Sequence, residues 1–327
     1  MKSRKILTLP LCTLLFALCS STEAQQYNKI YRVGHLSNGP GIREDQEKVI
    51  QQALRELGYV EGQNLVIEWR FSKGKLNLLP DLAAELVRLK MDVIVTGGNE
   101  AVQAAKEATP SIPIVMAFSG DPVGAGFVAS LARPGGNITG LSRLNIELSA
   151  KRLELLKETV LDVKRVAVLF NPEGRVPVLA LREVQATAER LGLQSQSLEV
   201  RVRADIESAF RSAAREGAGG LLVLPGGFLS YHRTQVVGLA AQGGLPGVYP
   251  NSRYVEAGGL MSYASNRSEE YRRAAIYVDK ILKGAKPADL PIQQPTKFEL
   301  VINLKTARTL GLKIPAHILM EADKVIE

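Results

Sequence analysis

Residues 113–129, PIVMAFSGDPVGAGFVA, pose the first question about the fold of this chain. An apolar run typical of a buried strand, residues 113–118, leads into a glycine-containing turn. Beyond it, Gly124, Gly126 and Ala129 have the G-x-G-x-x-A spacing of a dinucleotide-binding loop. The stretch therefore predicts a strand followed by a helix, and it raises the possibility of a nicotinamide or flavin enzyme.

The position of these glycines argues against a dinucleotide. A pyrophosphate is held where the strand meets the helix, because free backbone N–H groups point outward at that junction. In this chain the junction is Gly120-Asp121-Pro122, with Asp121 as a typical N-cap and Pro122 in the first turn. We therefore expect Gly124 and Gly126 to lie inside the helix, where small residues allow close packing, and we expect no cofactor.

Short β-rich runs alternate with helical patterns along the rest of the chain. In residues 78–90, for example, leucines recur at three- and four-residue steps. We expect strands at residues 30–37, 64–71, 92–98, 112–119, 164–171, 193–200, 220–226, 260–265 and 298–303. Because these strands alternate with helices, the sequence predicts an α/β fold with parallel sheets.

Segments of the first half of the chain recur in the second half. Residues 31–38 (YRVGHLSN) resemble 164–171 (KRVAVLFN), and 92–98 (DVIVTGG) resemble 220–227 (GLLVLPGG). In each pair the second segment follows the first by about 130 residues. The chain is also longer than one hydrophobic core usually serves. Together these observations predict two similar α/β lobes in tandem.

The N-terminus has the features of a secretory signal peptide. Basic residues precede an apolar run, residues 6–18, and small and polar residues follow up to Ala24. We expect a signal peptide over residues 1–24 and a periplasmic product. A lipid anchor at Cys19 is the alternative, but Leu18 is bulky where a small residue is expected.

The composition argues against several functions. The net charge of +8 is spread among acidic residues rather than clustered, so we expect no nucleic-acid partner. Residues 25–327 contain no cysteine, and His35, His232 and His317 are too isolated for a metal site. Without a G-x-S-x-G or Walker motif, we expect no enzyme, although Glu100 and Asp121 leave acid–base chemistry open.

Polar turns follow the predicted strands and supply the candidate ligand-binding residues. In open α/β sheets, ligands bind beyond the carboxyl ends of the strands. The candidates are Ser37, Asn38, Gly98, Asn99, Glu100, Ser119, Asp121, Asn171 and Tyr263. The turn at 98–100 opens a helix, so its backbone N–H groups are expected to hold a carboxylate. Asp121 is either an N-cap or an ammonium partner, and Tyr263 either stacks on a ligand or packs at a hinge.

Four longer blocks carry a family resemblance. They are LRELGYVEGQNLVIEWR (54–70), LPDLAAELVRLKMDVIV (79–95), DPVGAGFVASLARPGGNITGLS (121–142) and KPADLPIQQPTKFELVINLKTARTLGLKIP (286–315). From about Lys29 to the C-terminus the chain resembles the ABC-transporter substrate-binding family that includes tryptophan- and tyrosine-binding proteins. One departure is Pro225-Gly226-Gly227, where this family often has an aspartate that would suit a ligand's ammonium.

The resemblance implies a type I periplasmic-binding fold, with two Rossmann-like lobes joined by three crossover strands. We place the crossovers near Asn137–Leu141, Met261–Ser265 and Phe298–Val301. The implied N-terminal lobe comprises residues 29–139 plus 266–298, and the C-terminal lobe comprises residues 140–265 plus 299–327.

The resemblance also implies the function. We expect a monomer that binds a small solute, amino-acid-like or an aromatic carboxylate, and delivers it to the membrane permease of an ABC transporter. A ligand-sensing protein that serves a membrane receptor is the alternative.

Overall fold

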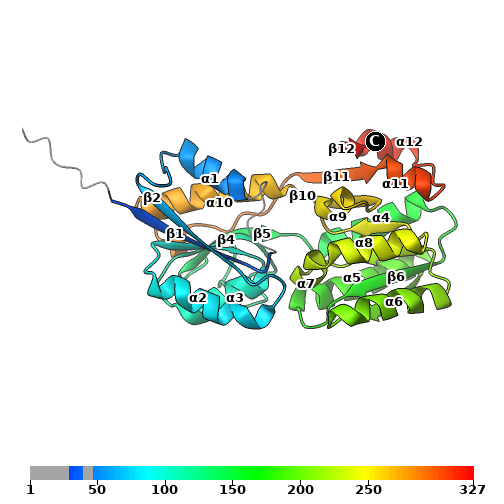
Figure 1. The fold of residues 1–327 in the computed structure, drawn as a ribbon, viewed down its shortest axis with the longest axis horizontal. Coiled ribbons are helices and arrows are strands. Elements are labelled where there is room, and N and C mark those ends of the chain that lie inside the picture. Colours follow the sequence, from blue (N-terminus) through cyan, green and yellow to red (C-terminus); the bar gives the residue numbers. More distant parts are fainter. Residues whose placement is uncertain (1–28, 40–46) are drawn as a thin grey trace, which may run out of the picture.

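The computed structural model describes residues 29–39 and 47–327, so the predicted signal peptide, with Ala24 and Cys19, lies outside the described residues. The described chain forms two α/β lobes side by side (Figure 1). None of the described helices combines the length and the apolar character needed to span a bilayer.

The first lobe is built on a parallel sheet in the order β2-β1-β3-β4-β5. Its strands are β1 (Tyr31–Ser37), β2 (Leu65–Phe71), β3 (Val93–Gly97), β4 (Ile114–Gly120) and β5 (Ile138–Arg143). Its helices are α1 (Glu47–Glu56), α2 (Leu79–Arg88), α3 (Asn99–Ala108) and α10 (Arg267–Leu282), with a short 3-10 turn at Leu76–Leu78 and another at Pro287–Asp289. Although α10 comes late in the sequence, it packs against α1 and β4 (Figure 1).

The second lobe has a seven-stranded sheet in the order β12-β11-β10-β9-β8-β6-β7. Its strands are β6 (Arg165–Phe170), β7 (Gln194–Glu199), β8 (Gly220–Val223), β9 (Gly247–Tyr249), β10 (Met261–Ser265), β11 (Phe298–Asn303) and β12 (Lys324–Ile326). Its helices are α4 (Glu147–Thr159), α5 (Arg175–Leu191), α6 (Arg203–Arg215), α7 (Gly227–Tyr231), α8 (Arg233–Gln242), α9 (Ser252–Glu256), α11 (Leu304–Thr309) and α12 (Ala316–Glu321). Only β10 and β11 pair antiparallel among the described strands.

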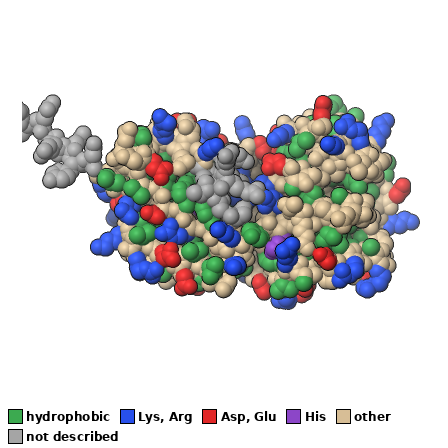
Figure 2. Space-filling model, in the orientation of Figure 1, with side chains coloured by type: hydrophobic (Ala, Val, Ile, Leu, Met, Phe, Trp, Pro, Cys, Tyr) green, Lys and Arg blue, Asp and Glu red, His purple; other side chains and the backbone are tan. Residues whose placement is uncertain are grey.

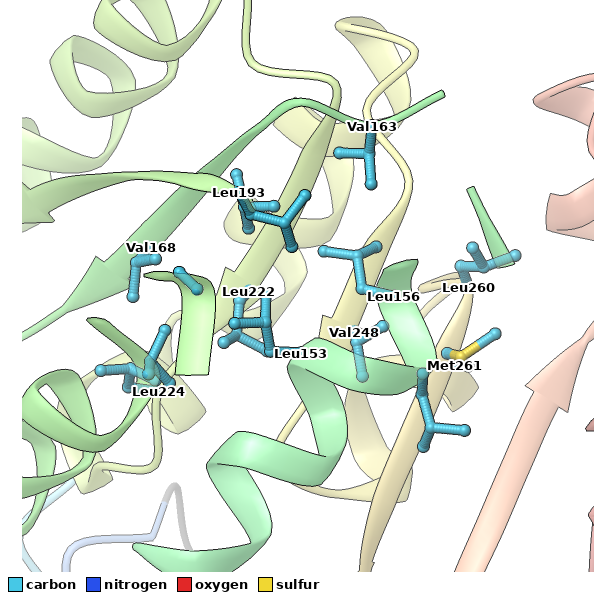
Figure 3. Close-up of a cluster of buried hydrophobic side chains, with 14 of the residues drawn as sticks. Leu153, Leu156, Val163, Val168, Leu193, Leu222, Leu224, Val248, Leu260 and Met261 are labelled. Carbon is cyan, nitrogen blue, oxygen red and sulfur yellow. The ribbon is translucent and has the colours of Figure 1, made fainter. Parts of the chain in front are cut away.

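Each sheet is covered by apolar side chains on both faces. In the first lobe one cluster lies under α1 and α10, and a second lies under α2 and α3. In the second lobe Leu153 and Leu156 of α4 pack on Val168, Leu222 and Val248 of the sheet (Figure 3). Burial of this apolar surface is the main force that stabilises both lobes.

The register of the first sheet determines which residues meet at its edge. Ser37 of β1 lies opposite Gly97 of β3, Gly97 lies opposite Phe118 of β4, and Gly120 lies opposite Arg143 of β5. Because the strands are parallel, their carboxyl ends come together at one edge of the sheet. This edge faces the second lobe.

The chain passes between the sheets three times, but not all at the predicted places. We expected the first crossing at residues 137–141, but most of these residues belong to β5, which pairs with β4 in the first sheet. The chain therefore crosses to the second lobe only after Arg143. The second crossing follows β10. The third precedes β11, where Gln293 pairs with Leu141 before the chain enters the second sheet.

A second correction concerns the segment after β4. We expected Gly124 and Gly126 inside a helix, but residues 121–126 form consecutive turns. Asp121 itself has φ +48°, and Gly126 closes the segment with φ +69°. Both values lie in the left-handed region, which ends a right-handed helix rather than starting one.

Candidate binding cleft

A large cavity lies between the two lobes, at the carboxyl ends of their strands. It offers about 130 Å³ to the centres of water-sized groups. One bound water needs about 10–15 Å³ by the same measure, so the cavity admits on the order of ten such groups. That capacity suits a small solute of amino-acid size.

An aromatic ring with two guanidinium groups forms the first-lobe wall. The guanidinium of Arg143 lies 3.9 Å from the centre of the Phe118 ring, and that of Arg267 lies 4.7 Å from it. Tyr271, one turn after Arg267 on α10, meets the same ring edge-on at 6.2 Å. Cations over an aromatic face are attracted by its electrons, which holds both arginines at the cavity.

The two arginines differ in how their charges are balanced. Arg143 donates from two nitrogens to the carboxylate of Glu270, and the Ser265 hydroxyl donates to the same carboxylate at 2.6 Å. Arg267 makes no ion pair with a described residue, and its Nε–H has no hydrogen-bond partner. Burial lowers the pKa of Arg267 and the neighbouring Arg143 lowers it further, while Tyr271, which is hydrogen-bonded to Arg267, and the carboxylate of Glu270 oppose this. Its positive charge is therefore the less well compensated of the two.

Glu100, in the first turn of α3, supplies the one carboxylate that lines the cavity among the described residues. Burial raises the pKa of Glu100, and only a bond from its own backbone N–H opposes this. The preceding Gly98 has φ +100°, a conformation that favours glycine. A Cβ at Gly98 would lie 3.4 Å from Oε2 of Glu100, so the carboxylate lies against this turn.

Asn99 connects α3 to the end of β4. Its side-chain amide donates to the carbonyl of Gly120 at 2.7 Å. Its oxygen accepts from the backbone N–H of Gly120 at 2.8 Å and from the Ser119 hydroxyl at 3.0 Å. These bonds use the polar atoms of both side chains inside the lobe, and Ser119, which is fully buried, does not line the cavity.

Asn38 follows β1 at the cavity. Its oxygen accepts from the Ser72 hydroxyl at 2.7 Å, while its buried Nδ2 has no partner. Ser37 also lines the cavity, and its hydroxyl oxygen accepts from the N–H of Gly39 at 3.2 Å. Asn38 is therefore the better placed of the two to donate a hydrogen bond to a solute.

The second-lobe wall consists mainly of the turns that precede α5, α7 and α9. It includes Gly174, Pro177, Pro225, Gly226, Gly227 and Asn251. Two arginines, Arg175 and Arg253, and Tyr231 also line the cavity from this side. Backbone and small residues therefore dominate this wall.

The lobes touch one another around the cavity. A Cβ at Gly120 would lie 2.9 Å from a methyl group of Val176, and a Cβ at Gly227 would lie 2.7 Å from Nδ2 of Asn38. At the rim, Arg175 donates to Asp121 at 3.1 Å across the gap. The cleft is therefore closed in this structure (Figure 2 shows the two lobes in contact).

The structure brings five of the nine sequence candidates to the cavity, namely Ser37, Asn38, Gly98, Asn99 and Glu100. Asp121 lies at the rim, where one of its oxygens also accepts from the N–H of Gly124. Asn171 accepts from the N–H of Glu173, and Tyr263 packs against Phe298 at 5.9 Å. Neither lines the cavity, which agrees with hinge packing for Tyr263 and turn chemistry for Asn171.

Sequence reasoning did not select Arg143, Arg267, Tyr271 or Phe118 as ligand-binding residues, although all four line the cavity. The signal for Arg143 and Arg267 is weak but present, because each arginine ends or follows a strand that leads into a crossing. His35 is buried beside Trp69. In the part of the chain that the structure describes, no three or more His, Cys, Asp or Glu side chains gather in a group that could hold a metal ion.

Comparisons with known proteins identify the family. Residues 34–326 match the family of ABC transporter substrate binding proteins. The chain belongs to this family. A tyrosine-binding protein of Clostridioides difficile is 26% identical over 264 residues, which cover 80% of this chain and 75% of that protein.

Two solved structures of similar proteins support the assignment and the fold. A conserved domain protein from Vibrio cholerae has a TM-score of 0.84 and 28% identity, covering 91% of this chain and all of that one. An ABC domain from Streptococcus pneumonia in complex with L-Trp has a TM-score of 0.83 and 29% identity, covering 90% of this chain and 99% of that one. The predicted fold class, two α/β lobes of the periplasmic-binding type, is confirmed.

Proposed function

We propose that this substrate-binding protein captures an amino-acid-like solute or an aromatic carboxylate in the cleft and delivers it to the permease of an ABC importer. The observation that carries the proposal is the closed cavity between the lobes, with the Phe118 ring and two arginines on one wall. An aromatic side chain stacks on such a surface, and a guanidinium binds a carboxylate. The tyrosine and tryptophan named for the two relatives fit the same chemistry.

The mechanism we propose is closure of the lobes about the three crossings. Solute first binds the first-lobe wall, which keeps its side chains in place through contacts within that lobe. The turns of the second lobe then cover the solute, and the glycine contacts allow the lobes to meet. We further propose that the protein is exported with removal of residues 1–24, acts as a monomer in the periplasm and catalyses no reaction.

A thermal-shift screen tests the function. We expect at least one aromatic amino acid or aromatic carboxylate to raise the unfolding midpoint further with each increase in concentration, as ligands that bind only the folded state must. A neutral sugar is the control solute and should leave the midpoint unchanged. Small-angle scattering should show compaction with the same ligand. The proposal would be refuted if no aromatic amino acid or aromatic carboxylate raised the unfolding midpoint and the radius of gyration stayed unchanged.

A further inference from the structure

Five charged side chains of the described chain line the cavity: Glu100, Arg143, Arg175, Arg253 and Arg267. Three of them have partners. Arg143 is paired with Glu270, Arg175 is paired with Asp121, and Arg253 also makes an interaction of its own. Glu100 and Arg267 make no ion pair with a described residue. The cavity is therefore lined by one acidic and one basic side chain that have no direct ion-pair partner among the described residues.

Both of these side chains belong to the first-lobe wall and lie near the Phe118 ring. The place of a Cβ at Gly98 is 3.4 Å from Oε2 of Glu100 and 3.7 Å from the Phe118 ring. The guanidinium of Arg267 lies over that ring. A carboxylate thus lies beside the ring and a guanidinium lies over it. No arginine contributes to the pKa shift of Glu100, which agrees with the two charges being apart.

Charges withdrawn from water without a counter-charge are costly, so a solute that neutralises both binds better than one that neutralises one. A solute with only a carboxylate satisfies Arg267 but leaves Glu100 unpaired beside another anion. The second lobe offers no carboxylate at its nearest turn, where Pro225, Gly226 and Gly227 lie. An ammonium therefore finds its carboxylate partner on the first-lobe wall.

We propose that Glu100 binds the ammonium group and Arg267 the carboxylate group of a zwitterionic aromatic α-amino acid, with Phe118 against its side chain. This assignment rests on the proposed function and narrows it from amino-acid-like solutes and aromatic carboxylates to the zwitterions. It also differs from the sequence-based expectation that the turn at residues 98–100 holds the carboxylate. Glu100 belongs to that turn and would repel an anion there.

The test compares three probes that differ by one charged group: L-phenylalanine, 3-phenylpropionate, which lacks the ammonium, and phenethylamine, which lacks the carboxylate. Calorimetry should show the wild-type protein binding L-phenylalanine at least tenfold tighter than either analogue, because a charge-assisted hydrogen bond is worth about a tenfold to hundredfold change in affinity. The Glu100→Gln variant should bind L-phenylalanine with at least tenfold lower affinity than the wild type, and it should bind 3-phenylpropionate no more weakly than the wild type. The Arg267→Gln variant should bind both probes that carry a carboxylate, L-phenylalanine and 3-phenylpropionate, more weakly than the wild type.

Glu107→Gln is the matched control, since Glu107 is an exposed carboxylate on the same helix; it should bind all three probes like the wild type. Circular dichroism and the unfolding midpoint check that each variant is folded, and Glu100→Asp should recover part of the discrimination. Equal wild-type affinity for L-phenylalanine and 3-phenylpropionate overturns the inference but leaves the proposed function intact. If Glu100→Gln lowers the affinity for L-phenylalanine and for 3-phenylpropionate by the same factor, the inference is also overturned, because Glu100 then has a structural role. Failure of all three probes, when the thermal-shift screen also finds no ligand, overturns both.

Discussion

The two walls of the cleft differ in the kinds of groups that line them. The first-lobe wall presents side chains: an aromatic ring, two guanidiniums, a carboxylate and an asparagine amide. The second-lobe wall presents mainly turns rich in glycine and proline, with arginines that are paired or otherwise engaged. We propose that the first wall recognises the solute and that the second wall covers it.

The difference shows how a bilobed protein divides binding between its halves. The side chains of the first wall are held by contacts inside their own lobe, such as Asn99 with Gly120 and Arg143 with Glu270. They are therefore in place before the lobes meet, which reduces the entropy lost on binding. The second wall contributes mostly through shape, because its glycines let the backbone approach the first lobe.

The largest expected effect concerns the support behind the first wall. His35 of β1 is buried against Trp69, Phe71 and Tyr271. Burial, followed by the charge of Arg267, lowers the pKa of His35 to about 3. Between pH 6.5 and 3, His35 is therefore protonated in the unfolded chain and neutral in the folded protein.

Stability contributed by His35 is thus present above pH 6.5 and is lost as pH falls toward 3. The loss is about 1.4 kcal/mol for each pH unit. We expect His35→Gln, which does not titrate, to show a pH dependence of unfolding free energy smaller by that slope between pH 6 and 4. Urea unfolding of both proteins at several pH values measures it. Parallel curves would mean that His35 is protonated in the folded protein.

The next effect tests whether the second wall acts through shape. Gly120→Ala places a Cβ 2.9 Å from Val176, closer than carbon atoms pack, so the closed state must shift. Such overpacking costs about 1 kcal/mol or more, which is at least fivefold in ligand affinity. Unfolding of the free protein should change little, because the lobes are able to remain apart.

Gly136→Ala is the control for this substitution, because a Cβ at Gly136 meets nothing within 4 Å. Calorimetry with the best ligand from the thermal-shift screen compares the two variants, and scattering reports whether the lobes still close. If Gly120→Ala and Gly136→Ala bind equally well, the contact between Gly120 and Val176 does not belong to the ligand-bound state.

The sequence predicts the turns of the first wall better than its arginines and aromatic rings. Turn residues such as Asn38 and Gly98 follow apolar runs directly, so their place at the strand ends can be read from local spacing. The strands themselves are predicted for the same reason, apart from short ones such as β9 and β12. What lies beyond the sequence is the meeting of distant side chains on the first wall.

Arg143 and Arg267 illustrate this limit. They are far apart in the sequence. Each is a charged residue at the end of a strand or helix, where a solvent-exposed side chain is the ordinary expectation. The pairing of β5 with β4 places Arg143 at the ring of Phe118, which itself looks like part of a buried strand. Only the return of α10 to the first lobe brings Arg267 to the same ring. The turn after Asp121 fails for a local reason instead: the residue types suit a helix start, but the backbone of Asp121 is left-handed.

The smallest expected effect concerns the charge that the second wall contributes at the rim. Arg175 pairs with Asp121 across the gap, and the Arg175 side chain is 53% exposed. Exposed ion pairs contribute about 0.2–1 kcal/mol, and salt screens them. We therefore expect Arg175→Gln to weaken ligand binding by no more than about fivefold, and less at high salt.

The two partners of this ion pair differ in what their removal disturbs. Asp121 also accepts from the N–H of Gly124, so removing its carboxylate alters the turn as well, while Arg175→Gln removes the charge alone. Asp121→Asn retains a side-chain oxygen for Gly124 and completes a double-mutant cycle, in which the coupling between the two residues should stay below 1 kcal/mol. A loss of tens of fold in Arg175→Gln that salt does not change would mean that Arg175 contacts the solute. The second wall would then share in recognition, and the division between a recognising wall and a covering wall would be wrong.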